Sequence, residues 1–368
     1  MFFDSRLSAS GAMSCASCHD ASNHFAPSNA LSVQIGGAKL DQAGTRAVPT
    51  LTYAASIPFF TEHYYESDEE GDGSLDQGPT GGRTWDGRVN RAREQAAIPL
   101  LAPNEMANES EAALVARVAT APYARQVKQL YGDAIFSDPH RAFGAVGAAL
   151  EAYQQNRAEF AAYTSKYDAF LRGQTQLSPQ ELRGLATFND PSKGNCAHCH
   201  KSQPSLSGKL PAFTDFGYVA LGVPRNPQIP ANADPTYFDL GACGPLRKDL
   251  ANRLEFCGLF RAPSLRNVAT RHSFYHNGVF HSLEEAVSFY ATRDTDPKRW
   301  YPTGPDRNVQ KFNDLPARYQ SNVDNEPPFG RHPGETPVLS DQDVTDIVAF
   351  LRTLTDGFNP QGVDKDGG

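Results

Sequence analysis

Residues 15–19 read C-A-S-C-H and residues 196–200 read C-A-H-C-H, so the pattern C-x-x-C-H occurs twice in this chain. In such a pattern the two thiols form thioether bonds to the vinyl groups of a haem, and the histidine lies under the iron as its proximal ligand. A structural zinc site or a C-x-x-C redox pair is the alternative. Because the motifs lie far apart and each has its own histidine, the sequence favours two covalently attached c-type haems.

The six cysteines of the chain divide into three pairs. Two pairs belong to the motifs, and the third pair, Cys243 and Cys257, predicts a disulfide in an oxidising compartment. Two free, buried thiols are the alternative for this third pair. The predicted haem-binding residues are Cys15, Cys18 and His19 in the first motif and Cys196, Cys199 and His200 in the second.

Composition limits the class of protein and its partners. The chain has 368 residues, 39% of them hydrophobic, and a net charge of −8, so it is long enough for two or three domains and nucleic acid is an unsuitable partner. No apolar run reaches the length of a membrane span. Covalent haem predicts export to the periplasm. No signal peptide is visible and residues 1–4 look like part of a structured segment, so we expect a trimmed N-terminus.

Helix signals dominate the chain, and strand alternation is scarce. Helix starts are predicted at Asn108, Asp138, Ser178, Ser282 and Ser340, each followed by a first-turn proline or by an acidic residue three positions on. The stretch from Asp138 is predicted to continue through residue 160. These patterns predict an all-α fold.

Long stretches rich in glycine and proline, including 66–82 and 302–338, separate the helical segments. Such loops are unusual in an ordinary domain and are expected where a haem supplies part of the core. Residues 66–82 are acidic and are interpreted as a solvated surface insertion, with a calcium loop or a partner-docking patch as the alternative. A change of helical segment near residues 160–178 predicts two domains, 1–165 and 166–368.

Residues 84–106 carry the side chains that distinguish an enzyme from an electron carrier. They include Trp85, Arg88, Gln95 and Glu105. A carboxylate near a ferric haem can move a proton between the two peroxide oxygens, and an amide can orient the bound molecule. Taken alone, each of these residues is more often a surface or capping residue.

Four further segments carry a family resemblance: R-A-V-P-T-L (46–51), W-D-G-R (85–88), residues 260–290 and residues 339–354. Together with the two motifs they resemble the bacterial di-haem cytochrome c peroxidase superfamily over nearly the whole chain. The resemblance implies two cytochrome-c-like helical domains with one haem on either side of their interface. It implies that Trp85 lies between the haems and that Gln95 and Glu105 line the peroxide pocket.

Tyr290 occupies the position at which ordinary peroxidases of this superfamily have a methionine ligand to the second haem. The three methionines of this chain lie elsewhere, at positions 1, 13 and 106. A core tyrosine is the alternative, because Leu283, Val287 and Tyr290 share one helical face. A phenolate ligand favours ferric and higher states, whereas a thioether raises the reduction potential. With a tyrosine at this position, the chain resembles the MauG/MbnH-like branch of the superfamily. Members of that branch store two oxidising equivalents in a high-valent two-haem state and use them on a partner's tryptophan.

Three departures qualify the resemblance. Residues 35–50 lack the histidine that many classical peroxidases place over the first haem, which implies an open pocket. Gly194 stands where MauG has a surface tryptophan, so methylamine dehydrogenase is a doubtful partner. For the family's calcium ion between the domains, Thr270 and His272 match the positions of backbone-carbonyl ligands, whereas Tyr53 stands at the usual asparagine.

The sequence therefore predicts a haem-dependent oxidoreductase that uses hydrogen peroxide to oxidise a partner protein, at tryptophan. One alternative is an ordinary cytochrome c peroxidase that reduces peroxide to water with electrons from a donor cytochrome or copper protein. Another is a di-haem electron carrier without catalysis. Donor-dependent turnover would separate the first two, and a first haem that is always six-coordinate would favour the carrier.

Overall fold

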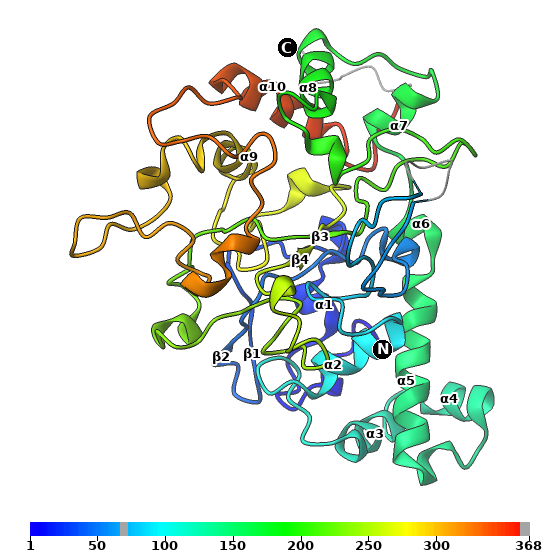
Figure 1. The fold of residues 1–368 in the computed structure, drawn as a ribbon. Coiled ribbons are helices and arrows are strands. Elements are labelled where there is room, and N and C mark those ends of the chain that lie inside the picture. The colour runs from blue at the N-terminus through cyan, green and yellow to red at the C-terminus, as the bar shows by residue number, and fades with distance from the viewer. Residues whose placement is uncertain (67–72, 361–368) are drawn as a thin grey trace, which may run out of the picture.

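The computed structural model describes residues 1–66 and 73–360, and most of its regular structure is helical (Figure 1). Within the described residues, no helix is both long and apolar enough to cross a membrane. Short 3-10 helices fill many connections, and one of them, η5 (Cys196–His198), begins the second motif. The α-helices are α1 (Cys15–Cys18), α2 (Ala92–Leu101), α3 (Glu111–Ala119), α4 (Ala124–Tyr131), α5 (Pro139–Gln154), α6 (Arg157–Phe160), α7 (Lys166–Leu171), α8 (Pro179–Asn189), α9 (Leu283–Thr292) and α10 (Asp341–Arg352).

Two small antiparallel sheets add to the predicted all-α fold. Strand β1 (Ile35–Gly36) pairs with β2 (Gln42–Ala43), with Ile35 opposite Ala43. Strand β3 (Tyr218–Val219) pairs with β4 (Phe260–Arg261), with Tyr218 opposite Arg261. Strands of two residues are too short to show alternation of polar and apolar side chains, so the sequence pattern could not reveal them.

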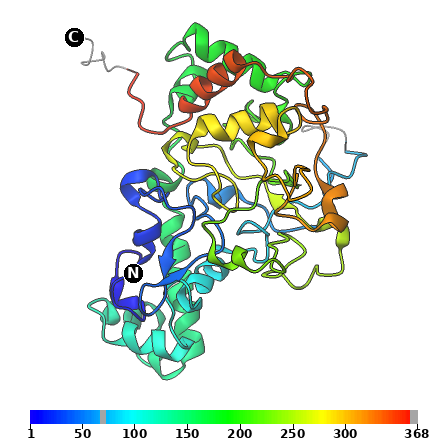
Figure 2. The same ribbon diagram turned by 90° about the vertical axis from the view of Figure 1, so that its left-hand side faces the viewer.

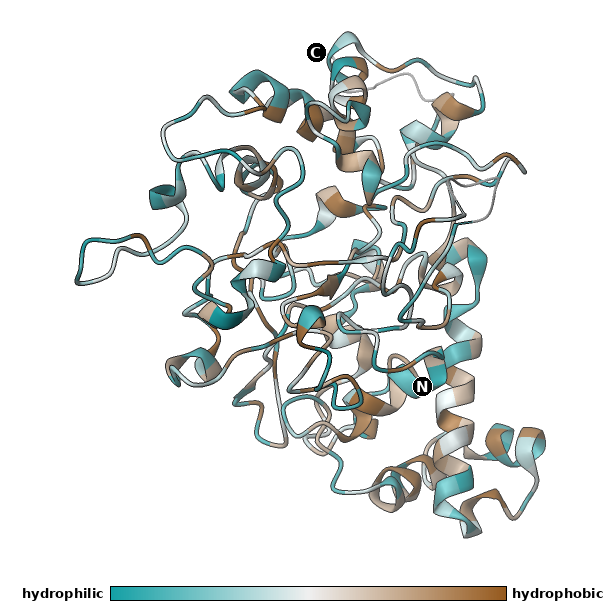
Figure 3. Cartoon of the chain, in the orientation of Figure 1, coloured by the Kyte–Doolittle hydropathy of each residue, from teal (hydrophilic) through white to brown (hydrophobic). Residues whose placement is uncertain are grey.

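The buried apolar side chains of the described residues form separate clusters. One runs from Phe2 to Phe160, where α2 packs on α5, and another runs from Tyr167 to Leu354, where α8 and α9 pack on α10. Figures 1 and 2 show the N-terminal helices at one end of the molecule and α8, α9 and α10 at the other. Hydrophobic and hydrophilic residues alternate along the helices in Figure 3, as expected when one side of a helix packs inward. The clusters support the division at 165/166, which stays a prediction.

Four of the five predicted helix starts are confirmed, while one predicted start and one predicted end differ. Helix α3 is capped by Ser110, whose hydroxyl accepts a hydrogen bond from the Ala113 N–H at 3.1 Å, and not by Asn108. The buried Asn108 amide donates instead to the carbonyls of Leu7 and Leu100. The helix from Asp138 ends at Gln154, because the Asn156 side chain accepts from the Ala158 N–H and starts the separate α6.

A buried ion-pair network holds the loop before α2 against the C-terminal half of the chain. The Arg46 guanidinium lies 2.7 Å from an Asp86 carboxylate oxygen and 2.6 Å from one of Asp239. Arg88 also pairs with Asp86, and Arg247 donates to the Asp86 carbonyl at 2.8 Å. Because these charges are buried, losing one partner would leave another uncompensated. The network therefore fixes the position of the W-D-G-R segment.

The acidic stretch 66–82 lies only partly within the described residues, since residues 67–72 fall outside them. Glu66 forms an ion pair with Lys201, directly after the second motif, at 3.4 Å. Thr80 pairs with Thr61 and with Gly217 in isolated bridges. The described parts of this insertion therefore lie against the C-terminal half. The calcium loop and the docking patch considered for it stay predictions.

Cys243 and Cys257 form a disulfide, in a third cluster with Leu250, Phe256 and Leu315. Replacing both cysteines by serine is expected to lower the free energy of unfolding by about 3 kcal/mol, because the unfolded chain loses a cross-link that closes a loop of this size. Denaturant titration of parent and variant measures the difference, and haem content per chain is the control. An unchanged free energy of unfolding would contradict the prediction.

Candidate active site

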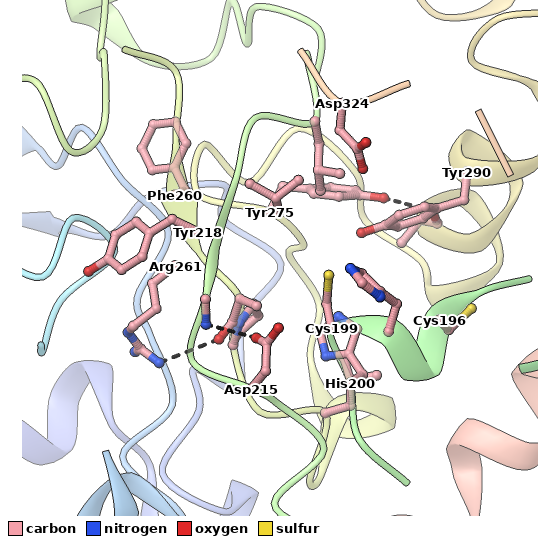
Figure 4. Close-up of a pocket in the computed structure, with 18 of the residues that line it drawn as sticks. Cys196, Cys199, His200, Asp215, Tyr218, Phe260, Arg261, Tyr275, Tyr290 and Asp324 are labelled. Atoms are coloured by element: carbon pink, nitrogen blue, oxygen red, sulfur yellow. Dashed lines mark hydrogen bonds between the residues drawn. The ribbon is translucent and has the colours of Figure 1, made fainter. Parts of the chain in front are cut away.

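A large cavity of about 740 Å³ lies between segments from both halves of the chain. The residues predicted to bind the second haem line this cavity. Its volume is in the range of cofactor pockets. Cys196, Cys199 and His200 line it, together with Tyr290 from α9 (Figure 4). Residues as distant in sequence as Trp85 also contribute to its wall. The structure therefore brings together the whole residue set predicted for the second haem.

The His200 ring is held in the orientation that an iron ligand needs. Its Nδ1 lies 2.9 Å from the Phe213 carbonyl oxygen, which leaves Nε2 available for a metal. Burial lowers the pKa of His200, so the ring is neutral, as ligation requires. Burial raises the pKa of Cys196 and of Cys199 to about 12, which keeps both thiols neutral. Neutral, unpaired thiols beside this cavity fit thioether attachment to a haem.

Tyr290 is a cavity residue and not only a packing residue of α9. Burial raises the pKa of its phenol, and the nearby Cys199 and Cys196 raise it further. Its ring stacks on Phe329 at 5.3 Å between centroids and lies 6.1 Å from the ring of Tyr275. Figure 4 shows Tyr290 and Tyr275 beside the residues of the second motif. This placement supports Tyr290 as a ligand and weakens its interpretation as a plain core tyrosine.

The histidine and the thiols of the first motif are held in the same way as those of the second. His19 Nδ1 lies 3.1 Å from the Phe25 carbonyl oxygen, and burial lowers the pKa of His19 to about 4. Burial raises the pKa of Cys15 to about 11 and that of Cys18 to about 12. These thiols form no disulfide. Within the described residues no group of three or more His, Cys, Asp or Glu side chains is gathered for a metal ion, so the zinc alternative has no convergent ligand set.

Glu105 faces the first motif. Its carboxylate is close enough to Cys15 and Cys18 to raise the pKa of both thiols. Burial raises the pKa of Glu105 itself, although the positive charge of Arg88 opposes the shift. A buried carboxyl group with a raised pKa can both accept and donate a proton near neutral pH.

The backbone of Glu105 is held by the β1–β2 hairpin. The Glu105 carbonyl accepts a hydrogen bond from the Gly37 N–H at 2.7 Å. A Cβ atom at Gly36 would lie 2.4 Å from the Asn104 carbonyl oxygen, so only glycine lets β1 approach this turn. Gln95 lies half-buried on α2, the helix that leads into the same turn. The structure therefore places both predicted pocket residues on one helix–turn unit.

Hydrogen bonds hold Trp85 in the wall of the cavity at the second motif. Its indole Nε1–H donates to the Ala47 carbonyl at 2.8 Å, and its own carbonyl accepts from the Arg261 N–H at 2.9 Å. Arg271 lines the same cavity, and its positive charge also lowers the pKa of His19. The first site and the second cavity therefore adjoin near Arg271, and the position of Trp85 between the two haems stays a prediction.

Two arginines in the cavity wall, the buried Arg261 and the half-buried Arg271, were not recognised from the sequence. No ion pair within the described residues includes Arg261 or Arg271. Among the described residues, the Arg271 guanidinium donates to the carbonyls of Val48 and Ser273, and the buried Arg261 Nε has no hydrogen-bond partner. Burial lowers the pKa of Arg271 to about 10. A guanidinium that faces a cavity without an ion-pair partner needs an anion, and the propionate carboxylates of a haem fit that requirement.

The carbonyls considered for calcium already have partners. The Thr270 carbonyl accepts from the Asn23 amide at 3.2 Å, and the His272 carbonyl lies 3.1 Å from His281 Nδ1. Tyr53 donates its hydroxyl to the Asp356 carboxylate at 2.7 Å. Calcium at this position stays a prediction.

Sequence comparison places the chain among di-haem enzymes. A family model described as di-haem cytochrome c peroxidase matches residues 1–176. Methylamine utilization protein MauG of Paracoccus denitrificans is 33% identical over 368 residues, which cover 97% of this chain and 87% of that protein. Cytochrome c551 peroxidase of Nitrosomonas europaea is 27% identical over 292 residues, which cover 78% of this chain and 69% of that protein.

Structural comparison agrees. The di-haem peroxidase BthA of Burkholderia thailandensis has a TM-score of 0.85 and 39% identity, over 98% of this chain and 87% of that one. A BthA variant with methionine in place of a tyrosine gives the same values. A MauG-like protein associated with microbial copper homeostasis has a TM-score of 0.65 and 25% identity, over 96% of this chain and 87% of that one.

The fold and the two sites thus define a haem-dependent, peroxidase-like oxidoreductase. The chain belongs to the di-haem cytochrome c peroxidase family and, within it, to the MauG-like branch. Membership implies two haem c cofactors, and the neutral thiols, oriented histidines and buried arginines described above fit them.

Proposed function

We propose that the protein uses hydrogen peroxide to oxidise a partner protein, at a tryptophan side chain. The observation that carries this proposal is Tyr290, which lies in the cavity wall with Cys199 and His200. A phenolate ligand is anionic and hard, and it stabilises oxidised iron more than a thioether does. Such a ligand suits the storage of oxidising equivalents and not the uptake of electrons from a donor.

The residues of the first site perform the proton transfers. A haem held here would supply an iron for binding hydrogen peroxide and the electrons for breaking its O–O bond. His19 would hold that iron. Glu105 would accept the proton of one peroxide oxygen and deliver it to the other, which leaves as water. The Gln95 amide would orient the bound molecule by a hydrogen bond.

The remaining residues connect the two sites. His200 and Tyr290 would hold the iron of the second haem, and Trp85 would carry charge between the sites from its fixed position beside Arg261. Each cytochrome-c-like domain, 1–165 and 166–368, would hold one haem. Covalent haem and the disulfide are consistent with the periplasm.

An ordinary cytochrome c peroxidase, reducing peroxide with a donor cytochrome or copper protein, is the second candidate. It is favoured by the relative named cytochrome c551 peroxidase, which is 27% identical. A non-catalytic carrier is less well supported, because it would have no use for the half-buried Glu105, whose pKa is raised, beside the first motif.

Optical and spin-resonance spectra of the ferric protein test the proposal. We expect one high-spin, five-coordinate haem and one low-spin haem with phenolate ligation. One equivalent of peroxide without a donor should yield a long-lived oxidised state. Co-expressed proteins from neighbouring genes should then show a mass change at tryptophan after peroxide. Two low-spin ferric haems, or turnover that depends strictly on a donor cytochrome, would contradict the proposal and favour the ordinary peroxidase.

A further inference from the structure

An aromatic cluster connects the second site to the surface at Trp300. The Tyr275 ring lies 6.1 Å from that of Tyr290, measured between centroids. Phe280 lies 5.4 Å from Tyr275 and 5.3 Å from Trp300. Phe289 lies 5.6 Å from both Tyr275 and Trp300. Two phenylalanine rings, of Phe280 and Phe289, therefore lie side by side between a half-buried tyrosine and a half-buried tryptophan.

The residues at the two ends of this cluster are the oxidisable ones. Tyrosine and tryptophan lose an electron far more easily than phenylalanine. Tyr275 and Trp300 would therefore be the residues that are oxidised in turn, and an electron would pass between them in a single step, without oxidation of Phe280 or Phe289. The chain has only two tryptophans. Trp85 lies in the cavity wall, whereas Trp300 is half-buried and follows the exposed Lys298 and Arg299. Trp300 is thus the tryptophan through which an outside molecule could be reached.

Local contacts indicate that Trp300 would stay oxidised only briefly. Its Nε1–H donates to the Thr292 hydroxyl at 3.0 Å, and that hydroxyl donates to the Ser288 carbonyl at 2.9 Å. Neither group is a base, so the indole keeps its proton when it loses an electron. The Arg299 guanidinium lies 4.5 Å from the ring centroid and disfavours the added positive charge. An oxidised Trp300 would therefore take an electron quickly from a donor outside.

We propose that Trp300 is the residue through which electrons leave the partner protein and enter this one, by way of Tyr275. The inference rests on the proposed function and adds the residue at which electrons from the partner enter this protein. Each hydrogen peroxide takes two electrons and two protons and becomes two water molecules. The partner's aromatic side chain loses those electrons one at a time through Trp300, and its protons go to solvent.

Peroxide added in the absence of a partner tests the inference on the holoenzyme. Trp300 should then be consumed itself, since indole plus hydrogen peroxide gives hydroxyindole and water. Mass spectrometry of the tryptic peptide 300–307 should show the added oxygen. Tyr275→Phe should reduce this modification several-fold, because the oxidisable stop before Trp300 is lost. Trp300→Phe should lengthen the lifetime of the peroxide-oxidised state, whereas Tyr131→Phe, a half-buried tyrosine on α4, should not.

An unmodified peptide 300–307 while peroxide is consumed would overturn the inference. Equal modification in parent and Tyr275→Phe would also overturn it, because peroxide would then be attacking the half-buried Trp300 ring directly. Both results leave the proposed function standing if the parent still forms a long-lived oxidised state. If the parent forms no such state, the proposed function fails first.

Discussion

Glu105→Gln is expected to slow the cleavage of hydrogen peroxide by about 100- to 10,000-fold, the usual worth of a positioned acid–base group. Glutamine has nearly the same shape but cannot take the proton of one peroxide oxygen and return it to the other. Both haems should remain attached, because Glu105 is not part of either motif. Rapid-mixing spectroscopy after one equivalent of peroxide measures the rate at which the oxidised state appears.

The pH dependence gives a second readout of the same residue. As a base, Glu105 must be ionised before it accepts a proton, and burial raises its pKa. The parent's rate should therefore fall as the pH decreases through a value above the pKa of an exposed glutamate, and Glu105→Gln should lose that dependence. Glu109→Gln, at an exposed position nearby, is the matched control. A parent-like rate in Glu105→Gln would show that another group moves the proton.

Tyr290→Met is expected to raise the reduction potential of the second haem, because a neutral thioether no longer stabilises oxidised iron as the phenolate does. The peroxide-oxidised state should become short-lived, and oxidation of a partner protein should fall. Peroxidase turnover with a small electron donor should persist or increase. Potentiometric titration and the decay rate after one equivalent of peroxide measure these changes.

Tyr290→Phe separates the two effects of that substitution, since it removes the phenolate without adding a thioether. It should also shorten the lifetime of the oxidised state, and its ferric spectrum should lose the phenolate signature. An oxidised state as long-lived in both variants as in the parent would make Tyr290 incidental. The ordinary peroxidase would then be the better assignment.

Local patterns predicted the parts of the fold that local forces control. The capping boxes at Ser178 and Ser340 and the capped start at Ser282 are confirmed, because a cap is formed by residues only three positions apart. Helix α2, which carries Gln95, was missed, since Pro99 lies inside it and proline normally interrupts a helix. Packing on α5 stabilises α2 despite that proline.

The sequence by itself determined the two C-x-x-C-H motifs, the cysteine pair 243/257 and, through the family resemblance, the candidates Glu105 and Tyr290. These are statements about residue types at short spacing, which covalent chemistry requires. Only the tertiary structure decided which charged side chains of the cavity wall lack an ion-pair partner within the described residues, and so identified Arg261 and Arg271 as cavity cations. It also decided that Tyr275, two phenylalanines and Trp300 form one cluster. Burial and ring contact depend on segments that are distant in the chain, and no local pattern records them.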